Sequence, residues 1–63
     1  MKKFYLKLKG HTDIWEVEAS SLKHAKQIVA NYIWTQYGDD PDYTIKKLKE
    51  IDKNTPHEEI NVL

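Results

Sequence analysis

The sequence contains no cysteine and no arginine, and each absence narrows what the chain can do. Without cysteine there are no disulfides, which support many domains of this size, and no thiolate nucleophile. All ten basic residues are lysine, so the guanidinium fork that usually reads phosphate, carboxylate or guanine is missing. Ten acidic residues balance the lysines, and the formal net charge of zero argues against a general polyanion binder.

Long hydrophobic runs are also missing. No stretch approaches the roughly 20 apolar residues that a membrane-spanning helix needs, and residues 1–9 alternate lysine with apolar residues instead of forming a signal peptide. We therefore expect a cytoplasmic protein with no membrane partner. The 63 residues predict one domain, with a compact unit over residues 1–53. After the break at Asn54–Pro56, residues 54–63 form a tail or a short extra edge strand.

The clearest pattern predicts a helix from Ser20 to Gln36. Ser20 or Ser21 can cap its start, because a hydroxyl there accepts a hydrogen bond from a free backbone N–H. Gly38 is well placed to end it. The predicted buried face repeats at spacings of three and four residues and comprises Leu22, Ala25, Ile28, Val29, Tyr32 and Ile33.

Two strands precede this helix. Apolar residues alternate with lysines over residues 3–9 and with glutamates over residues 14–19, which is typical of strands with one buried face. A turn at Gly10–His11 places Leu6 near Trp15 and Phe4 near Val17, whereas a four-residue loop shifts the register by two residues and keeps the same faces. Lysines of the first strand then face glutamates of the second, and such pairs stabilise a sheet by about 0.2–1 kcal/mol.

Residues 43–51 are ambiguous. Tyr43, Thr44 and Ile45 favour a strand, whereas apolar residues recurring every three positions suit a short helix. We favour a strand with a bulge near Lys46–Lys47, because a two-stranded sheet is a poor partner for a long helix. The prediction is an α+β fold, a two-layer ββαβ sandwich whose antiparallel three-stranded sheet has the order 2-1-3.

One helix crosses one face of this predicted sheet, and the other face is open to solvent or to a partner. The predicted core lies between the helix and the sheet. Its members are Leu6, Trp15, Val17, Val29 and Ile33.

Enzyme chemistry finds no support in the sequence, and we expect no catalytic residue, cofactor or metal. Ser20 and Ser21 are explained as caps, and nothing brings together His11, His24 and His57 as an activated nucleophile and its base would require. The acidic cluster Asp39–Asp42 is interrupted by Pro41 and lacks the spacing of a calcium loop.

The predicted function is contact with another protein. Trp34 falls more than a right angle from the apolar face, on the side that also holds Lys23 and Tyr37, and tryptophan is a frequent interface anchor. The alternative is that Trp34 folds under the loop at residues 39–43. We expect a protein-binding module or small inhibitor, of a kind common in viruses and mobile elements, acting on another protein or as a homo-oligomer.

A second hypothesis is nucleic-acid binding through the open face of the sheet. Lys3, Lys7 and Lys9 would surround Tyr5 as a base-stacking platform, together with the lysines from 46 to 49. Glutamates on the same face and the zero net charge disfavour this function relative to protein binding.

Overall fold

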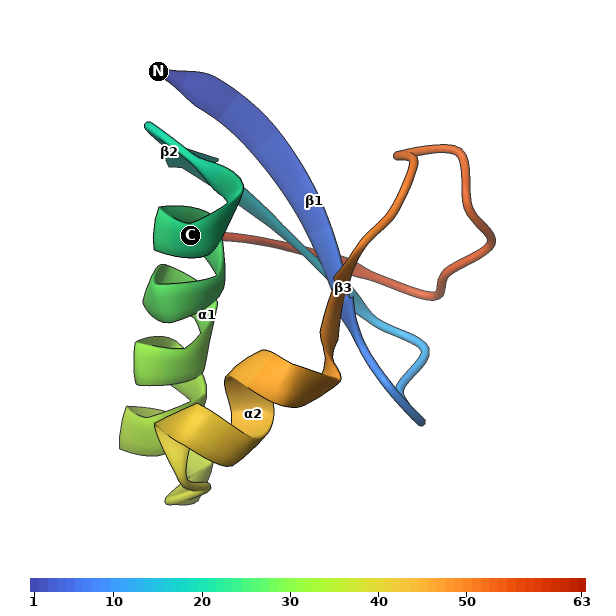
Figure 1. The fold of residues 1–63 in the computed structure, drawn as a ribbon. Helices are drawn as coiled ribbons and strands as arrows, with labels where there is room; N and C mark the ends of the chain where they lie inside the picture. Colours follow the sequence, from blue (N-terminus) through green and yellow to red (C-terminus); the bar gives the residue numbers. More distant parts are fainter.

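Two helices lie on one side of a four-stranded sheet in the computed structural model, which describes residues 1–63 (Figure 1). In chain order the elements are β1 (Lys2–Leu8), β2 (Ile14–Ala19), α1 (Leu22–Tyr37), α2 (Pro41–Lys47), β3 (Leu48–Glu50) and β4 (Ile60–Val62). The sheet order is β3-β1-β2-β4, in which β4 runs parallel to β2 and the other neighbours are antiparallel. The α+β class is confirmed.

The hairpin of β1 and β2 has the register predicted for a turn at Gly10–His11. Leu6 pairs with Trp15, and Phe4 pairs with Val17. Gly10 has φ 86° in the turn, a left-handed conformation that glycine adopts without a steric penalty. Because side chains alternate along a strand, this register directs Phe4, Leu6 and Leu8 of β1 and Trp15, Val17 and Ala19 of β2 to the side that faces α1.

The caps of α1 follow from the residues at its two ends. The backbone N–H of His24 donates to Ser21 Oγ at 3.2 Å, so Ser21 is the N-cap. At the other end Gly38, with φ 76°, donates its N–H to the carbonyl of Trp34. The predicted helix is therefore confirmed to within a residue or two at each end.

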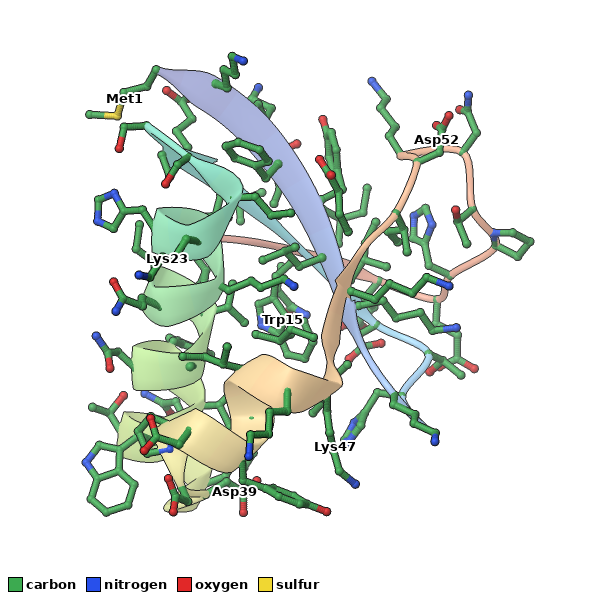
Figure 2. The ribbon with its side chains drawn as sticks, in the orientation of Figure 1. Met1, Trp15, Lys23, Asp39, Lys47 and Asp52 are labelled. Carbon is green, nitrogen blue, oxygen red and sulfur yellow. The ribbon has the colours of Figure 1, made fainter.

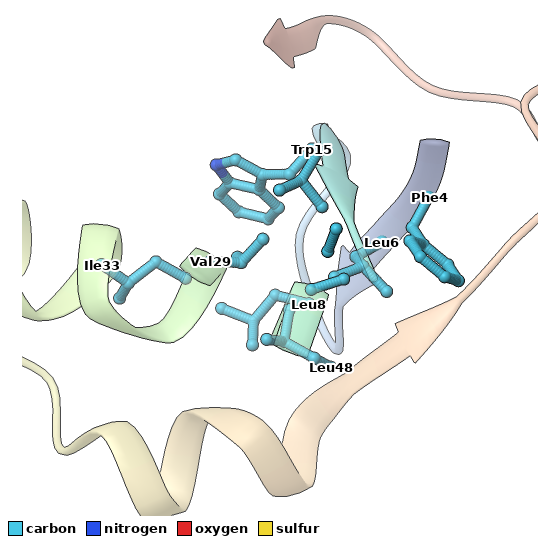
Figure 3. Close-up of a cluster of buried hydrophobic side chains, with 10 residues drawn as sticks. Phe4, Leu6, Leu8, Trp15, Val29, Ile33 and Leu48 are labelled. Carbon is cyan, nitrogen blue, oxygen red and sulfur yellow. The ribbon is translucent and has the colours of Figure 1, made fainter. Parts of the chain in front are cut away.

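The core fills the space between α1 and the sheet (Figure 3). All five predicted members are buried in one cluster, which also includes Phe4, Leu8, Ala19, Ala25 and Leu48. Leu22 and Ile28 of the predicted helix face are partly buried against it, whereas Tyr32 is exposed.

The strand predicted over residues 43–51 is wrong for its first half, since Tyr43 to Lys47 belong to α2 and only Leu48–Glu50 form a strand. Asp40 caps α2 by accepting the N–H of Asp42 at 2.9 Å, and Pro41 occupies the first turn, where its fixed φ suits a helix. Lys46 and Lys47 lie in the last turn, where positive charge complements the helix dipole.

The predicted three-stranded sheet is incomplete. The observed order β3-β1-β2-β4 differs from the predicted three-stranded order, because the extra edge strand considered for residues 54–63 is present as β4 beside β2. The N–H of Ile14 donates to the carbonyl of Glu59, and the N–H of Leu63 donates to the carbonyl of Glu16. Local sequence patterns do not reveal such a parallel pairing between segments so far apart.

The sheet face turned away from α1 is not fully open, contrary to the prediction. Ile14 lies on that face by alternation from Trp15 and is completely buried. The chain from residue 51 to residue 59 passes on this side of the sheet (Figure 1), and Ile51, Thr55 and His57 are half-buried within it. This segment leaves less free surface than a bare sheet would.

Candidate functional site

The last turn of α1 carries two exposed aromatic side chains. Trp34 is 53% exposed and Tyr37 is 71% exposed, so the loop after the helix does not cover Trp34. Ala30, one turn earlier on the same side, is fully buried, and α2 packs against α1. We call Trp34 and Tyr37 the aromatic turn.

Lys23, the third predicted partner-binding residue, lies away from the aromatic turn. It precedes Trp34 by eleven helical positions, or roughly 16 Å at the helical rise of about 1.5 Å per residue. Figure 2 shows Lys23 near the start of α1 and Asp39 beyond its end. The structure brings two of the three predicted residues together and leaves Lys23 outside.

A cleft of about 380 Å³ opens beside the aromatic turn, between the C-terminal half of α1 and the β2–β4 edge of the sheet. We call it the Trp15 cleft. Its volume lies within the range of small-ligand sites in proteins, about 300–1,000 Å³. The apolar and aromatic part of its wall consists of Leu8, Trp15, Tyr32, Ile33 and Tyr37.

The polar part of the wall is mostly acidic. It consists of His11, Asp13, Asp39, Glu59 and Asn61. These residues come from the β1–β2 turn, the loop after α1 and the neighbourhood of β4. No lysine lines the cleft, so its wall carries three carboxylates against a single histidine.

Trp15 joins the core to the cleft. The side chain is 6% exposed, and its Nε1–H is buried without a hydrogen-bond partner. Leaving such a donor unpaired costs about 1–3 kcal/mol. Figure 3 shows the indole nitrogen pointing away from Leu6, Leu8 and Leu48. The aliphatic core therefore holds the ring, while its polar atom points away from these three leucines.

A second concave surface, which we call the lysine groove, lies at the β1–β3 side of the molecule. Its volume is about 820 Å³. Five lysines line it, and no carboxylate does: they are Lys7, Lys9, Lys46, Lys47 and Lys49. Lys7 pairs with Lys49 directly across two strands, an arrangement of like charges that weakens a sheet.

Tyr43 stands beside this groove. The Nζ of Lys47 lies 4.5 Å from the centre of the Tyr43 ring, within the range of a cation–π contact. The tyrosine side chain remains exposed. The groove therefore combines lysines with one accessible aromatic ring.

The structure divides the predicted nucleic-acid-binding residues. Lys7 and Lys9 line the lysine groove, whereas Lys3 and Tyr5 do not. Lys3 Nζ lies 3.9 Å from a Glu16 carboxylate oxygen, the one ion pair of the molecule. Partial burial of Tyr5, its hydrogen bond with Glu16 and the charge of that carboxylate all raise the pKa of Tyr5. Tyr5 is thus engaged with its cross-strand neighbour.

The remaining polar candidates have local structural partners. Ser21 and Asp40 cap the two helices, and His57 Nδ1 lies 2.6 Å from the carbonyl oxygen of Thr55. His, Asp and Glu side chains nowhere converge closely enough for three of them to hold one metal ion. The carboxylates of the Trp15 cleft are therefore too widely spaced to share such an ion.

The helical spacing of the sequence predicted that Trp34 and Tyr37 lie off the buried face, but no sequence pattern predicted the Trp15 cleft. The alternation in β2 correctly predicts a buried Trp15, and nothing in that pattern shows that its N–H is left without a partner. Three separate stretches of the chain build the cleft wall, namely residues 8–15, 32–39 and 59–61.

No protein-family model, curated protein or solved structure matches this chain. Neither α1 nor α2 has the length and apolar composition that crossing a bilayer would require.

Proposed function

We propose that the protein is a small protein-binding module that contacts its partner through the aromatic turn. The observation that carries this proposal is the exposure of Trp34 at the end of a helix whose opposite face is buried in the core. Tryptophan and tyrosine bury a large area with few rotatable bonds and are enriched among the residues that dominate interface energies. Inhibition of the bound protein, or pairing with a second copy, is compatible with this mode of contact.

The aromatic turn is also rigidly presented. Ile33 beside Trp34 is a core residue, and the Gly38 cap ends the helix immediately after Tyr37. A side chain on such a support loses less conformational freedom on binding than one on a mobile loop. The exposed rings are therefore suited to act as anchors.

Trp34→Ala tests this proposal. Because Trp34 is about half exposed, its truncation should destabilise the fold by clearly less than the about 3–5 kcal/mol typical of a buried tryptophan. Loss of an anchor should weaken binding by about 2 kcal/mol or more, or roughly 30-fold. The measurements are thermal melting, sedimentation over a concentration series, and quantitative mass spectrometry of proteins captured from lysate.

Tyr43→Ala is the matched control, because Tyr43 is similarly exposed but lies on α2. We expect this variant to retain self-association or capture. A large drop in the melting temperature of Trp34→Ala, with association and capture unchanged, would contradict the proposal and assign Trp34 a structural role.

Nucleic-acid binding is the second candidate function, and the lysine groove favours it. Five lysines with no lining carboxylate concentrate positive potential that the zero net charge of the whole chain conceals. The nearby exposed ring of Tyr43 offers a surface on which a base could stack. The predicted contact thus moves from Tyr5 and Lys3 to the lysines around Lys7 and Lys9.

Lys7→Glu tests this second function. Anisotropy titrations with labelled single-stranded RNA and DNA should show affinity that falls steeply with salt, because bound phosphates release counterions. Lys7→Glu should weaken binding of all sequences and reduce the salt slope by about one or more. Lys23→Glu, outside the groove, should change affinity less. Absence of binding at low salt would eliminate this candidate.

A further inference from the structure

We propose that the Trp15 cleft receives a lysine or arginine side chain of the partner polypeptide, whose main-chain carbonyl accepts the Trp15 Nε1–H. This inference rests on the proposed protein-binding function and gives the partner a chemistry. Two independent observations carry it, namely the buried indole donor without a partner and the acidic, aromatic wall around it.

The indole N–H requires an acceptor. The Trp15 side chain that carries it is more than nine-tenths buried. Rotation of this side chain toward bulk solvent would remove the indole ring from the core cluster. Asn61 pairs with Trp15 across β2 and β4, but its side-chain nitrogen is directed to the carbonyl of Ile14, at 3.5 Å. The Nε1 atom has less than 1 Å² of accessible surface, so an incoming carbonyl oxygen would satisfy the donor only once the wall around the indole edge opens on binding.

The wall determines the charge of the ligand. Asp13, Asp39 and Glu59 face the cleft and His11 is the only basic lining residue, so an anion would be repelled and a cation attracted. Tyr32 and Tyr37 supply aromatic surfaces, which bind ammonium and guanidinium groups by cation–π contact. The three carboxylates do not converge on a metal site, which favours a larger organic cation with several donors.

A polypeptide provides both groups at once. A basic residue carries its cation at the end of a long apolar stem, and its own main chain supplies a carbonyl acceptor. Tyr37 belongs both to the aromatic turn and to the wall of the cleft. A partner that covers Trp34 and Tyr37 therefore reaches the cleft without leaving the same surface.

Blocked tripeptides provide the test, with central arginine, lysine, acetyl-lysine or glutamate between two alanines. In ¹H–¹⁵N NMR spectra the Trp34→Phe variant leaves one indole signal, from Trp15. We expect this signal to move saturably with the arginine and lysine peptides and to remain in place with the acetyl-lysine and glutamate peptides.

Charge-neutral variants identify the cleft as the binding site. Asp13→Asn and Glu59→Gln should each weaken the peptide affinity by roughly two- to fivefold, the effect of losing one partly exposed ion pair. Glu18→Gln changes an exposed carboxylate of β2 that lies outside the cleft, and it should leave the affinity unchanged. The amide spectrum of each variant verifies that its fold is intact.

An unmoved Trp15 signal at millimolar arginine peptide would overturn the inference, as would equal weakening by Glu18→Gln. These failures are separate from failure of the proposed function. If Trp34→Ala abolishes capture while the peptides do not bind, the cleft inference alone fails. If the peptides bind while Trp34→Ala leaves capture and association unchanged, the aromatic turn is wrong and the cleft remains a site for basic groups.

Discussion

At the scale of single residues, the two tryptophans play opposite parts. Trp15 stabilises the core with its ring and leaves one polar atom without a partner. Trp34 leaves about half of its surface in solvent. Residue type alone does not distinguish them, because the same side chain serves cores and interfaces. The periodicity of the neighbouring positions does so, since it correctly excluded Trp34 from the face buried in the core.

Val29 provides the sharpest test of the core assignment. Its side chain is fully buried in the main cluster, so Val29→Asp would place an unpaired carboxylate in an apolar layer. A buried charge without a partner costs about 3–5 kcal/mol, which a domain this small should not survive. We expect loss of the cooperative thermal transition in circular dichroism.

Asn31→Asp is the matched control, since it introduces the same residue at an exposed position of α1. It should melt close to the unsubstituted protein. Two variants with equal melting temperatures would show that the buried face of α1 has been misassigned.

At the scale of elements, the prediction was wrong for α2, because a strand was expected where Tyr43 to Lys47 form a helix. Tyr43, Thr44 and Ile45 favour extended structure as single residues, yet the Asp40 cap and Pro41 initiate a helix before them. The helical form also packs against α1, and Thr44 of α2 is buried. Local propensity is a weak guide when a cap and tertiary burial both oppose it.

The Asp40 cap can be tested directly. Asp40→Ala removes the acceptor of the Asp42 N–H and should cost about 0.5–2 kcal/mol. For a domain of this size, each 1 kcal/mol lowers the melting temperature by roughly 4–8 °C. Thermal denaturation of this variant beside Asp39→Ala makes the comparison, because the Asp39 carboxylate caps no helix. Equal losses in the two variants would contradict a specific role for the cap.

At the scale of the whole molecule, the sequence predicted the parts that local patterns define and missed those assembled from distant segments. The hairpin register, α1 and the five core residues follow from alternation and from helical spacing. The Trp15 cleft, the pairing of β4 with β2 and the cover over Ile14 each join segments from opposite ends of the chain. No short stretch of the sequence contains both segments of such a contact, so local patterns do not predict these three features.

Charge is also organised at this scale. The net charge of zero is correct for the whole chain but does not show how the charges are distributed over its surface. Lysines line one concave surface and carboxylates line most of the polar wall of the other. The zero net charge therefore describes the average surface and does not exclude a charged ligand at either concave surface.

The parallel pairing of β4 with β2 has a consequence for partly unfolded forms of the chain. β4 is only three residues long, and its release would leave unpaired backbone groups along Ile14–Glu16 of β2. An edge of this kind captures strands of other chains. Loss of the β4 pairing would therefore expose a site at which a strand of another copy can add to the sheet.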